Sequence, residues 1–272
     1  MRFALIDNLR VEANPGLKGI CPGCGQPVLT KCGTIRVHHW AHQRTELCDS
    51  WGEPETEWHR SWKNNFPHLW QECFMRDVLT GEKHMADVRT DHGLVIEFQH
   101  SHLKPQERIA RENFYRDLVW IVDGTRLVND FPRFLKGQNQ IQPTGKSGIF
   151  HVYDPAKCFP SAWLSSSVPV LFDFLGGGQL NNPLDSRNQL YCLFPIKVGR
   201  RATLARIPRS AFIKTAINGD WSVRVTGIMK ELLKGKEDWD NQEEIIRSAW
   251  QLQESEIKRF SERLGYGKGR RF

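Results

Sequence analysis

The stretch HMADVRTDHGLVIEFQHS (residues 84–101) decides the fold, because it predicts a β-hairpin with an acid in each strand. Two runs typical of strands flank a turn-forming group at residues 91–93. A three-residue loop there predicts that Asp87 lies directly opposite Glu97, since both are equally far from the centre of the loop. Like charges in opposed positions destabilise a pair of strands. The two carboxylates therefore require a compensating group.

A divalent cation between the strands would remove this repulsion. Carboxylate oxygens are the ligands that Mg²⁺ prefers, and water and phosphate complete its coordination shell. We therefore expect Asp87 and Glu97 to bind Mg²⁺ or Mn²⁺. Gln99 accompanies Glu97 on one face, because side chains alternate along a strand. The alternative is that both acids lie on a strand face that is exposed to solvent.

Patterns around the hairpin follow the order helix, strand, strand, strand, helix, strand. Residues 54–66 are predicted as a helix, with large aromatic side chains at a spacing of four. Residues 68–75 are predicted as the strand before the hairpin. A second helix begins at Pro105, and a buried strand covers residues 118–124. This order is that of a mixed α/β protein.

The first of these helices carries further polar candidates. Glu57 is a third acid, and His59 and Lys63 share one face because they are four residues apart. The tryptophan stripe of the helix would pack on the sheet. We therefore expect at least one of these three groups to lie near Asp87 and Glu97.

These patterns resemble the core of the PD-(D/E)XK, or restriction-endonuclease-like, nucleases, and they resemble the CoiA-like competence proteins more closely. The resemblance covers roughly the first half of the chain. The segments that carry it are CPGC (21–24), HWAH (39–42), ETEWHRSWK (55–63), ADV (86–88), IEFQHS (96–101), ERIARENFY (107–115) and WIVDG (120–124).

The resemblance implies a Mg²⁺- or Mn²⁺-dependent enzyme that hydrolyses DNA phosphodiester bonds in bacterial DNA uptake, recombination or defence. Asp87 and Glu97 would bind the metal, and Glu57 would be the helix acid that some members add. Gln99 stands where the general nuclease pattern has lysine. Either Lys63 or His59 could then restore a cation or a base from the helix.

The second helix contributes a candidate contact to DNA. Arg111 is four residues from Glu107, so the first interpretation is an ion pair on the helix surface. The resemblance places this helix near the site, where Arg111 would contact a phosphate group instead.

A cysteine–histidine cluster near the N-terminus predicts a structural zinc site. Cys21 and Cys24 form one close pair, and His39 and His42 form another. Zinc binds such sets tetrahedrally, and four protein ligands leave no open position for catalysis.

The gap between the two histidines is shorter than in most zinc sites. Cys48 or Cys32 is therefore an alternative ligand, and His38 is a further one. Arg36 flanks the cluster and is a second candidate contact to DNA phosphate.

Composition narrows the class of protein. The chain has 272 residues, 39% of them hydrophobic, and a net charge of +7, which permits a polyanionic partner such as DNA. It has no apolar run long enough to cross a membrane and no pattern typical of a signal peptide. We therefore expect a cytoplasmic protein, in which the seven cysteines do not form a disulfide framework.

We predict three parts: a zinc-knuckle-like module over residues 1–50, the nuclease-like core over residues 51–136, and an extension with strands and a terminal helix over residues 137–272. Residues 137–148 are predicted as a linker or long loop. The terminal helix covers residues 238–264. Its apolar stripe, which we expect to be core, comprises Ile246, Trp250, Ile257, Phe260 and Leu264.

Two other functions compete with the nuclease. One is a nucleic-acid-binding protein that keeps the nuclease fold, cuts weakly and acts with a recombinase or helicase. The other is a zinc-stabilised scaffold without a nucleic-acid role. Gln99 in place of lysine favours the first of these alternatives, whereas the acids at positions 57, 87 and 97 favour the enzyme.

Overall fold

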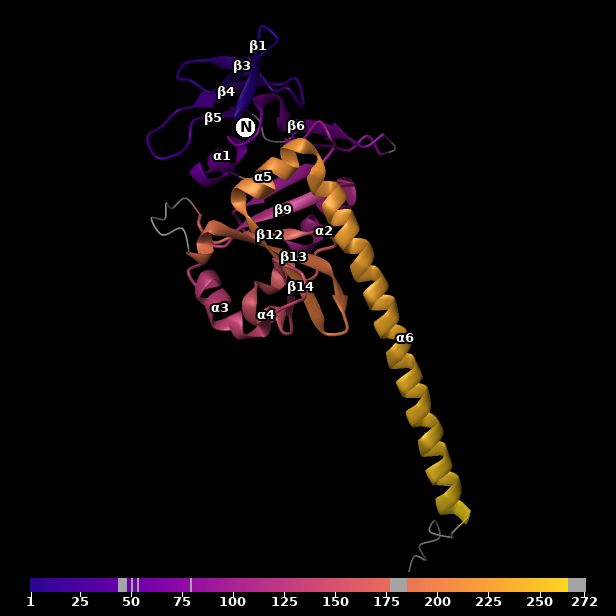
Figure 1. The fold of residues 1–272 in the computed structure, drawn as a ribbon. Coiled ribbons are helices and arrows are strands. Elements are labelled where there is room, and N and C mark those ends of the chain that lie inside the picture. The colour runs from indigo at the N-terminus through magenta and orange to yellow at the C-terminus, as the bar shows by residue number, and fades with distance from the viewer. Residues whose placement is uncertain (44–47, 50, 53, 79, 177–184, 264–272) are drawn as a thin grey trace, which may run out of the picture.

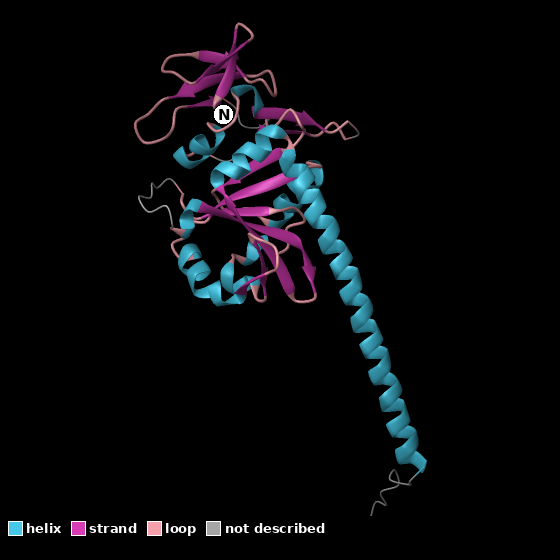
Figure 2. Ribbon diagram, in the orientation of Figure 1, coloured by secondary structure: helices cyan, strands magenta, loops and turns pink. Residues whose placement is uncertain are grey.

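The chain folds into a mixed α/β protein with two sheets, as the computed structural model in Figure 1 shows. The structure describes residues 1–43, 48–49, 51–52, 54–78, 80–176 and 185–263, and the side chains up to residue 259. A five-stranded sheet forms the N-terminal part, and a nine-stranded sheet forms the body of the molecule. Figure 2 separates these strands from the helices around them.

The N-terminal sheet is antiparallel, with the strand order β2-β1-β3-β4-β5. Its strands are β1 (Phe3–Ile6), β2 (Leu9–Glu12), β3 (Lys18–Ile20), β4 (Pro27–Lys31) and β5 (His39–His42). The core of this sheet is small, and its largest buried side chain is Trp40. A module with so little apolar core generally needs a metal, a disulfide or a neighbouring domain for stability.

The predicted order of helix, three strands, helix and strand is confirmed in the body. Its elements are α1 (Glu57–Lys63), β6 (Gln71–Arg76), β7 (Lys83–Arg89), β8 (Val95–Gln99), α2 (Pro105–Phe114) and β9 (Leu118–Asp123). The strand predicted from residue 68 begins three residues later, because the short 3-10 helix η1 (His68–Trp70) precedes β6.

The remaining strands extend the same sheet. The elements are α3 (Asp130–Lys136), η2 (Gly137–Gln140), β10 (Ile141–Pro143), β11 (Ile149–Val152), α4 (Pro155–Cys158), η3 (Ser161–Trp163), β12 (Val170–Asp173), η4 (Ser186–Asn188), β13 (Gln189–Val198), β14 (Arg201–Pro208), α5 (Arg209–Asn218) and α6 (Asp220–Arg263). The strand order is β10-β11-β14-β13-β12-β9-β8-β7-β6. The prediction of a loop over residues 137–148 is wrong, because η2 and β10 lie within it and β10 pairs with β11.

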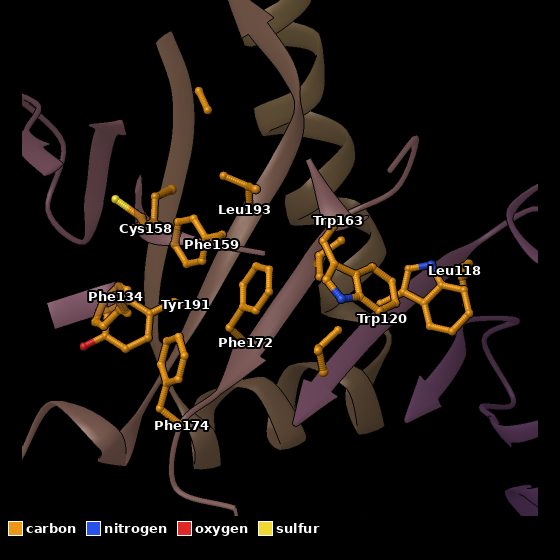
Figure 3. Packing of buried hydrophobic residues seen from close by; sticks show 14 of the residues in the cluster. Leu118, Trp120, Phe134, Cys158, Phe159, Trp163, Phe172, Phe174, Tyr191 and Leu193 are labelled. Atoms are coloured by element: carbon orange, nitrogen blue, oxygen red, sulfur yellow. The ribbon is translucent and has the colours of Figure 1, made fainter. Parts of the chain in front are cut away.

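Helices cover both faces of the large sheet. Side chains from α1, α5 and the start of α6 pack on one face, and side chains from α2, α3 and α4 pack on the other. Figure 3 shows part of the second layer, where Phe134 and Tyr191 have ring centroids 4.4 Å apart. Phe159 and Phe172 lie 4.6 Å apart in the same layer. These layers fix the positions of α1 and α2 on either side of the β7–β8 hairpin.

Asp173 anchors α1 to the sheet. This residue of β12 has no exposed surface, and its carboxylate accepts hydrogen bonds from the indole nitrogens of Trp58 (3.0 Å) and Trp62 (2.9 Å). Arg209 neutralises the charge with a contact of 2.5 Å. The predicted tryptophan stripe therefore packs inward through polar contacts as well as apolar ones. A lone acid in an apolar strand is here a structural residue.

Helix α6 is much longer than the sequence pattern suggested. It runs from Asp220 to Arg263, and its second half extends beyond the body (Figure 1). The prediction that its stripe belongs to the core is wrong, because Ile246, Trp250 and Ile257 are exposed by 56, 63 and 60%. The Phe260 side chain and Leu264 lie outside the described residues. Within the described residues, no helix is sufficiently long and apolar to cross a membrane.

Candidate active site and candidate metal centre

The hairpin has the predicted register. Val88 pairs with Ile96, and the Thr90 amide donates to the Leu94 carbonyl over 2.9 Å, which closes a three-residue loop. Gly93 ends this loop with φ of +91°, a conformation that residues with a side chain rarely adopt. Asp87 precedes Val88 and Glu97 follows Ile96, so the same antiparallel register places Asp87 opposite Glu97.

The hydrogen bonding between β7 and β8 changes at this position. Two backbone amides donate to the carboxylates of Asp87 and Glu97 and not to backbone carbonyls. The Asp87 amide donates to Glu97 Oε1 over 3.2 Å, and the Phe98 amide donates to Asp87 Oδ2 over 3.0 Å. Each acid thus binds the backbone of the opposite strand. This exchange fixes both carboxylates at the point where the regular pairing of β7 and β8 ends.

Lys63 of α1 lies among three of the carboxylates. Its ammonium is 3.0 Å from Asp87, 3.3 Å from Glu72 and 3.8 Å from Glu55. The Lys63 residue is only 4% exposed, so its charge depends on these acids. The prediction that a polar residue of the first helix lies near the acid pair is confirmed for Lys63.

Arg111 of α2 pairs with Glu97 from the other side. The contact is 2.9 Å, and the same guanidinium reaches Glu107 at 2.6 Å and the Trp51 carbonyl. The predicted pair with Glu107 exists, but it is not on the surface, because Arg111 is only 6% exposed. Arg111 therefore compensates buried acids in this structure and is not presented to an external phosphate.

The charges of this network shift the pKa of several groups. Burial and the neighbouring Asp87 raise the pKa of Glu97 to about 8, although Arg111 opposes the shift. Burial would also raise the pKa of Glu72, but Lys63, the chain's amino terminus and the amides of residues 2 and 3 lower it to about 2. Burial would lower the pKa of Lys63, but the three carboxylates raise it. Burial therefore favours the protonated form of Glu97, whereas the contact with Arg111 favours the ionised form.

Glu55 adds to the network a carboxylate oxygen that accepts no hydrogen bond from the described residues. Its side chain is 5% exposed, and its Oε1 accepts a hydrogen bond from Arg60 over 2.9 Å. Its Oε2 is buried and has no hydrogen-bond partner among the described residues. Buried polar atoms without a protein partner are uncommon, and this oxygen is available to accept a hydrogen bond or to bind a cation. The carboxylate network thus has both an orphaned oxygen and a carboxylic acid that a cation could deprotonate.

Glu57 lies away from this network. It is exposed and lines a depression of about 620 Å³ between the N-terminal sheet and α1, together with Arg36 and Arg60. Glu57 is the first residue of α1, whereas Glu55 precedes the helix and turns inward to Lys63. The expectation that Glu57 would join the two strand acids is therefore corrected, and the acid of this segment that reaches Lys63 is Glu55. Arg36 is exposed, so its side chain is accessible to a partner.

His59 and Gln99 are engaged by their own surroundings. The His59 ring completes a capping box with Thr56 at the start of α1, and its Nε2 contacts the Phe98 carbonyl over 3.1 Å. Gln99 Nε2 donates to the Ser101 carbonyl over 3.1 Å. Both residues lie next to the acids along the chain or across the helix–sheet contact. Their catalytic roles stay predictions.

Glu55 and Glu72 were not predicted from the sequence. Glu72 lies in a segment that reads as an ordinary strand, yet it has φ of +49° and its carboxylate accepts from the amides of Arg2 and Phe3. A strained residue of this kind is common at functional sites. The only sequence signal was an acid in an otherwise apolar strand, which is the signal that identified Asp87 and Glu97.

A second cluster lies at the edge of the N-terminal sheet. Cys21, Cys24, His42 and Cys48 each offer one ligand atom, and the four atoms lie within 4.8 Å of one another. The Cys21 and Cys48 sulfurs are 3.8 Å apart, which is about the separation of two thiolates on a tetrahedral zinc ion. The Cys24 sulfur is 3.2 Å from His42 Nε2. These residues could therefore bind a metal, and their donor set is consistent with zinc.

His39 is not part of this cluster, and Cys48 takes its place. Residues three apart on a strand point to opposite faces, so His39 and His42 of β5 diverge. His39 Nδ1 contacts the Val37 carbonyl over 2.8 Å instead. Of the alternatives considered, Cys48 is therefore the one that lies in the cluster, while Cys32 and His38 line the depression next to α1.

The local structure favours a metal at this cluster. Gly23 between the two cysteines lies close under the Phe74 ring, and a Cβ atom there would be 2.1 Å from that ring, which would have to move. The Gly23 amide donates to the Cys21 sulfur over 3.3 Å, which stabilises a thiolate. Burial and the adjacent Cys21 raise the pKa of Cys48 to about 12 in the absence of a cation. A metal would replace these thiol protons and crosslink a sheet that has little apolar core.

Residues 17–50 match the family model described as the N-terminal domain of the competence protein CoiA. The resemblance to CoiA-like competence proteins is thus confirmed, and the matched segment contains all four residues of the cysteine–histidine cluster. It ends before the acid pair. No curated protein and no solved structure matches the chain.

Proposed function

Because residues 17–50 match the model of the CoiA N-terminal domain, we propose that the protein acts on DNA during competence, recombination or defence in bacteria, as a metal-dependent nuclease. The body would be a PD-(D/E)XK, or restriction-endonuclease-like, core. The observation that carries this proposal is the exchange of carboxylate–amide hydrogen bonds between Asp87 and Glu97. It holds two acids at one break in a sheet, where a structural role alone does not require them.

In this proposal the two strand acids would bind a magnesium or manganese ion. Asp87 and Glu97 offer hard carboxylate oxygens, which these cations prefer. Each strand acid already accepts hydrogen bonds at both oxygens, but an ionised carboxylate oxygen has a second acceptor direction. Glu55, whose Oε2 has no hydrogen-bond partner among the described residues, is joined to this pair through Lys63. When bound, the metal would polarise a phosphoryl oxygen and lower the pKa of a bound water.

Lys63 is the residue that best replaces the lysine of the general nuclease pattern. Its ammonium contacts Asp87 at 3.0 Å, and the surrounding carboxylates keep it charged. A fixed positive charge next to the acid pair would stabilise the negative charge that develops on a phosphate during hydrolysis. His59 is less suited to this role, because its ring holds Thr56 and the Phe98 carbonyl. Gln99 would orient a water or a phosphate through its amide.

The cysteine–histidine cluster would bind a structural zinc ion in this proposal. Four protein ligands fill a tetrahedral site and leave no position for a substrate. The zinc would hold the N-terminal sheet against the body, where Glu72 accepts hydrogen bonds from the amides of Arg2 and Phe3. The module would thereby also position Glu72 beside Lys63.

A second function is favoured by one observation. Both strand acids are already paired with cations, Asp87 with Lys63 and Glu97 with Arg111. A chain in which these pairs persist would bind nucleic acid without cutting it, and would act with a recombinase or helicase. Its affinity would come from phosphate contacts and would fall steeply with salt.

Cleavage assays with matched variants test the proposal. Labelled single- and double-stranded DNA is incubated with Mg²⁺, Mn²⁺ or EDTA and with the variants Asp87→Asn, Glu97→Gln and Glu107→Gln. The first two should lower the cleavage rate by roughly a thousandfold, because they weaken metal-assisted phosphate activation. Glu107 also pairs with Arg111 but lies outside the strand pair, so Glu107→Gln should stay within about tenfold of the parent.

Each result has a clear meaning. Equal cleavage by the parent and by both strand variants would overturn the proposed site. A parent protein that binds DNA but does not cut it with either metal would favour the binding function. A parent that cuts equally well in EDTA would exclude a divalent cation from the reaction.

A further inference from the structure

The outer half of α6 carries apolar side chains that the body does not cover. Near its start the helix packs on the large sheet through Trp221, which is 5% exposed. Trp239 is the last aromatic residue on the body side, where Arg201 lies 5.4 Å from its ring. Beyond it, Ile246, Trp250 and Ile257 are more than half exposed. In Figure 1 this segment stands clear of both sheets.

The exposed residues follow a heptad pattern. Ile246, Trp250, Gln253 and Ile257 are separated by four, three and four residues, and Phe260 continues the same spacing in the sequence. This period of 3.5 residues is typical of coiled coils, in which the alternating positions form one seam. A single polar residue in such a seam, here Gln253, commonly fixes the register.

We propose that residues 243–263 of α6 form an antiparallel two-stranded coiled coil with a second copy of the chain. The seam is self-complementary in the register that places Trp250 beside Gln253 of the second copy. Ile246 then packs against Ile257 of that copy, and the same contact recurs by symmetry. Two-fold pairing of one surface with itself is the commonest form of protein self-association.

Charges beside the seam select the antiparallel direction. Arg247 and Glu254 occupy the same flanking position in successive heptads. In the antiparallel register Arg247 faces Glu254 of the second copy. Because the pairing is two-fold symmetric, this contact occurs twice and gives two ion pairs. In a parallel coil Arg247 would face the uncharged Gln242. The charge pattern therefore complements a second copy that runs in the opposite direction.

The shape of the molecule permits this pairing. Residues 243–263 form a helix of about 31 Å that projects from the body. In the proposed register residues 243–260 of the two copies overlap, and the two bodies lie at opposite ends. Each assembly would then carry two acid pairs that are separated by the coil.

Sedimentation equilibrium of the full chain tests the proposal with two adjacent isoleucines. Ile246 lies in the seam, whereas Ile245 is exposed by 69% but lies outside it. The parent mass should rise with concentration from 31.5 kDa toward twice that value. Ile246→Lys should remain at 31.5 kDa at every concentration, and Ile245→Lys should associate like the parent. Circular dichroism confirms that both variants keep their helix.

Charge reversal tests the direction. Arg247→Glu should weaken association by about tenfold, because it places like charges opposite each other twice. The double variant Arg247→Glu with Glu254→Arg should restore the parent affinity. A parent that stays at 31.5 kDa, or equal association of the two isoleucine variants, would overturn the seam. An unchanged affinity in Arg247→Glu would overturn the antiparallel arrangement.

Discussion

Replacing Glu97 by glutamine should change how the stability of the protein depends on pH. Glu97 is buried, and its pKa is raised from 4.5 to about 8 by burial and by Asp87. Between these two pH values the folded state holds the Glu97 proton and the unfolded state does not. The stability that this group contributes is therefore fully present below pH 4.5 and is lost as the pH rises through about 8.

The size of this effect follows from proton linkage. One extra proton bound in the folded state lowers the free energy of unfolding by about 1.4 kcal/mol for each rise of one pH unit. From pH 5.5 to pH 7.5 the contribution of Glu97 is thus a loss of about 2.5 kcal/mol, because the group begins to ionise in the folded state near the upper end of this range. Glutamine does not titrate, so Glu97→Gln should lack this slope. The substitution also has a pH-independent cost, because an amide accepts fewer hydrogen bonds, and only the slope is diagnostic.

Urea denaturation in EDTA at several pH values measures the slope. Histidines titrate in the same pH range in both proteins. Subtracting the unfolding free energy of the parent from that of the variant therefore removes their contribution. The unfolding free energy of the variant relative to that of the parent should rise by about 2.5 kcal/mol from pH 5.5 to pH 7.5. Glu107→Gln, whose side chain is 31% exposed beside the same Arg111, should run parallel to the parent. A Glu97→Gln variant that also runs parallel to the parent would refute the reasoning.

Three further outcomes are expected. Cys48→Ser should lose the copurifying zinc and the soluble yield together. His39→Ala should keep about one zinc per chain by elemental analysis, because Cys48 lies in the cluster and His39 does not. Lys63→Met should lower the free energy of unfolding by about 3–5 kcal/mol in urea denaturation, because it leaves buried acids without their cation, and added Mg²⁺ should recover part of this loss. Asp173→Asn should lower the melting temperature of the body and leave zinc content unchanged, because it removes the charge that holds Arg209 against the tryptophans of α1.

Local pattern and register were predictable, because each depends on residues close together in the sequence. The turn at residues 91–93 fixed the opposition of Asp87 and Glu97, and the alternation of helix and strand patterns gave the order of elements around it. At least one polar residue of the first helix was expected near the acids, because the apolar stripe of that helix had to face the sheet, and Lys63 is that residue. These inferences required only the periods of helix and strand.

Contacts between distant segments were not predictable in the same way. Glu72 becomes part of the acid network through the amides of Arg2 and Phe3, which come from another sheet. Glu55, and not Glu57, reaches Lys63 because the chain turns inward just before the helix cap at Thr56. His39 was chosen for its spacing, but the spacing places it on the wrong face of a strand that the sequence did not reveal.

The exposed stripe of α6 shows a different limit. An amphipathic pattern indicates that one face of a helix is covered, but it does not say by what. Trp221 is covered by the chain's own body, whereas Trp250 is 63% exposed on the same helix. A core helix and an association helix have similar patterns, and the 3.5-residue spacing distinguishes them only when the position of the helix is known.

Binding of Mn²⁺ with simultaneous proton release is the most direct test of the central claim, which is that a divalent cation binds at Asp87 and Glu97. Calorimetry at pH 7 in buffers of different ionisation enthalpy counts the protons displaced by the metal. The pKa of about 8 for Glu97 predicts a release close to one proton per bound ion, and a much smaller release at pH 9. Zinc-loaded protein is used, so that the cysteine–histidine cluster does not take up the manganese. Binding by the parent that is lost in Glu97→Gln would agree with the account, and equal binding by both proteins without proton release would contradict it.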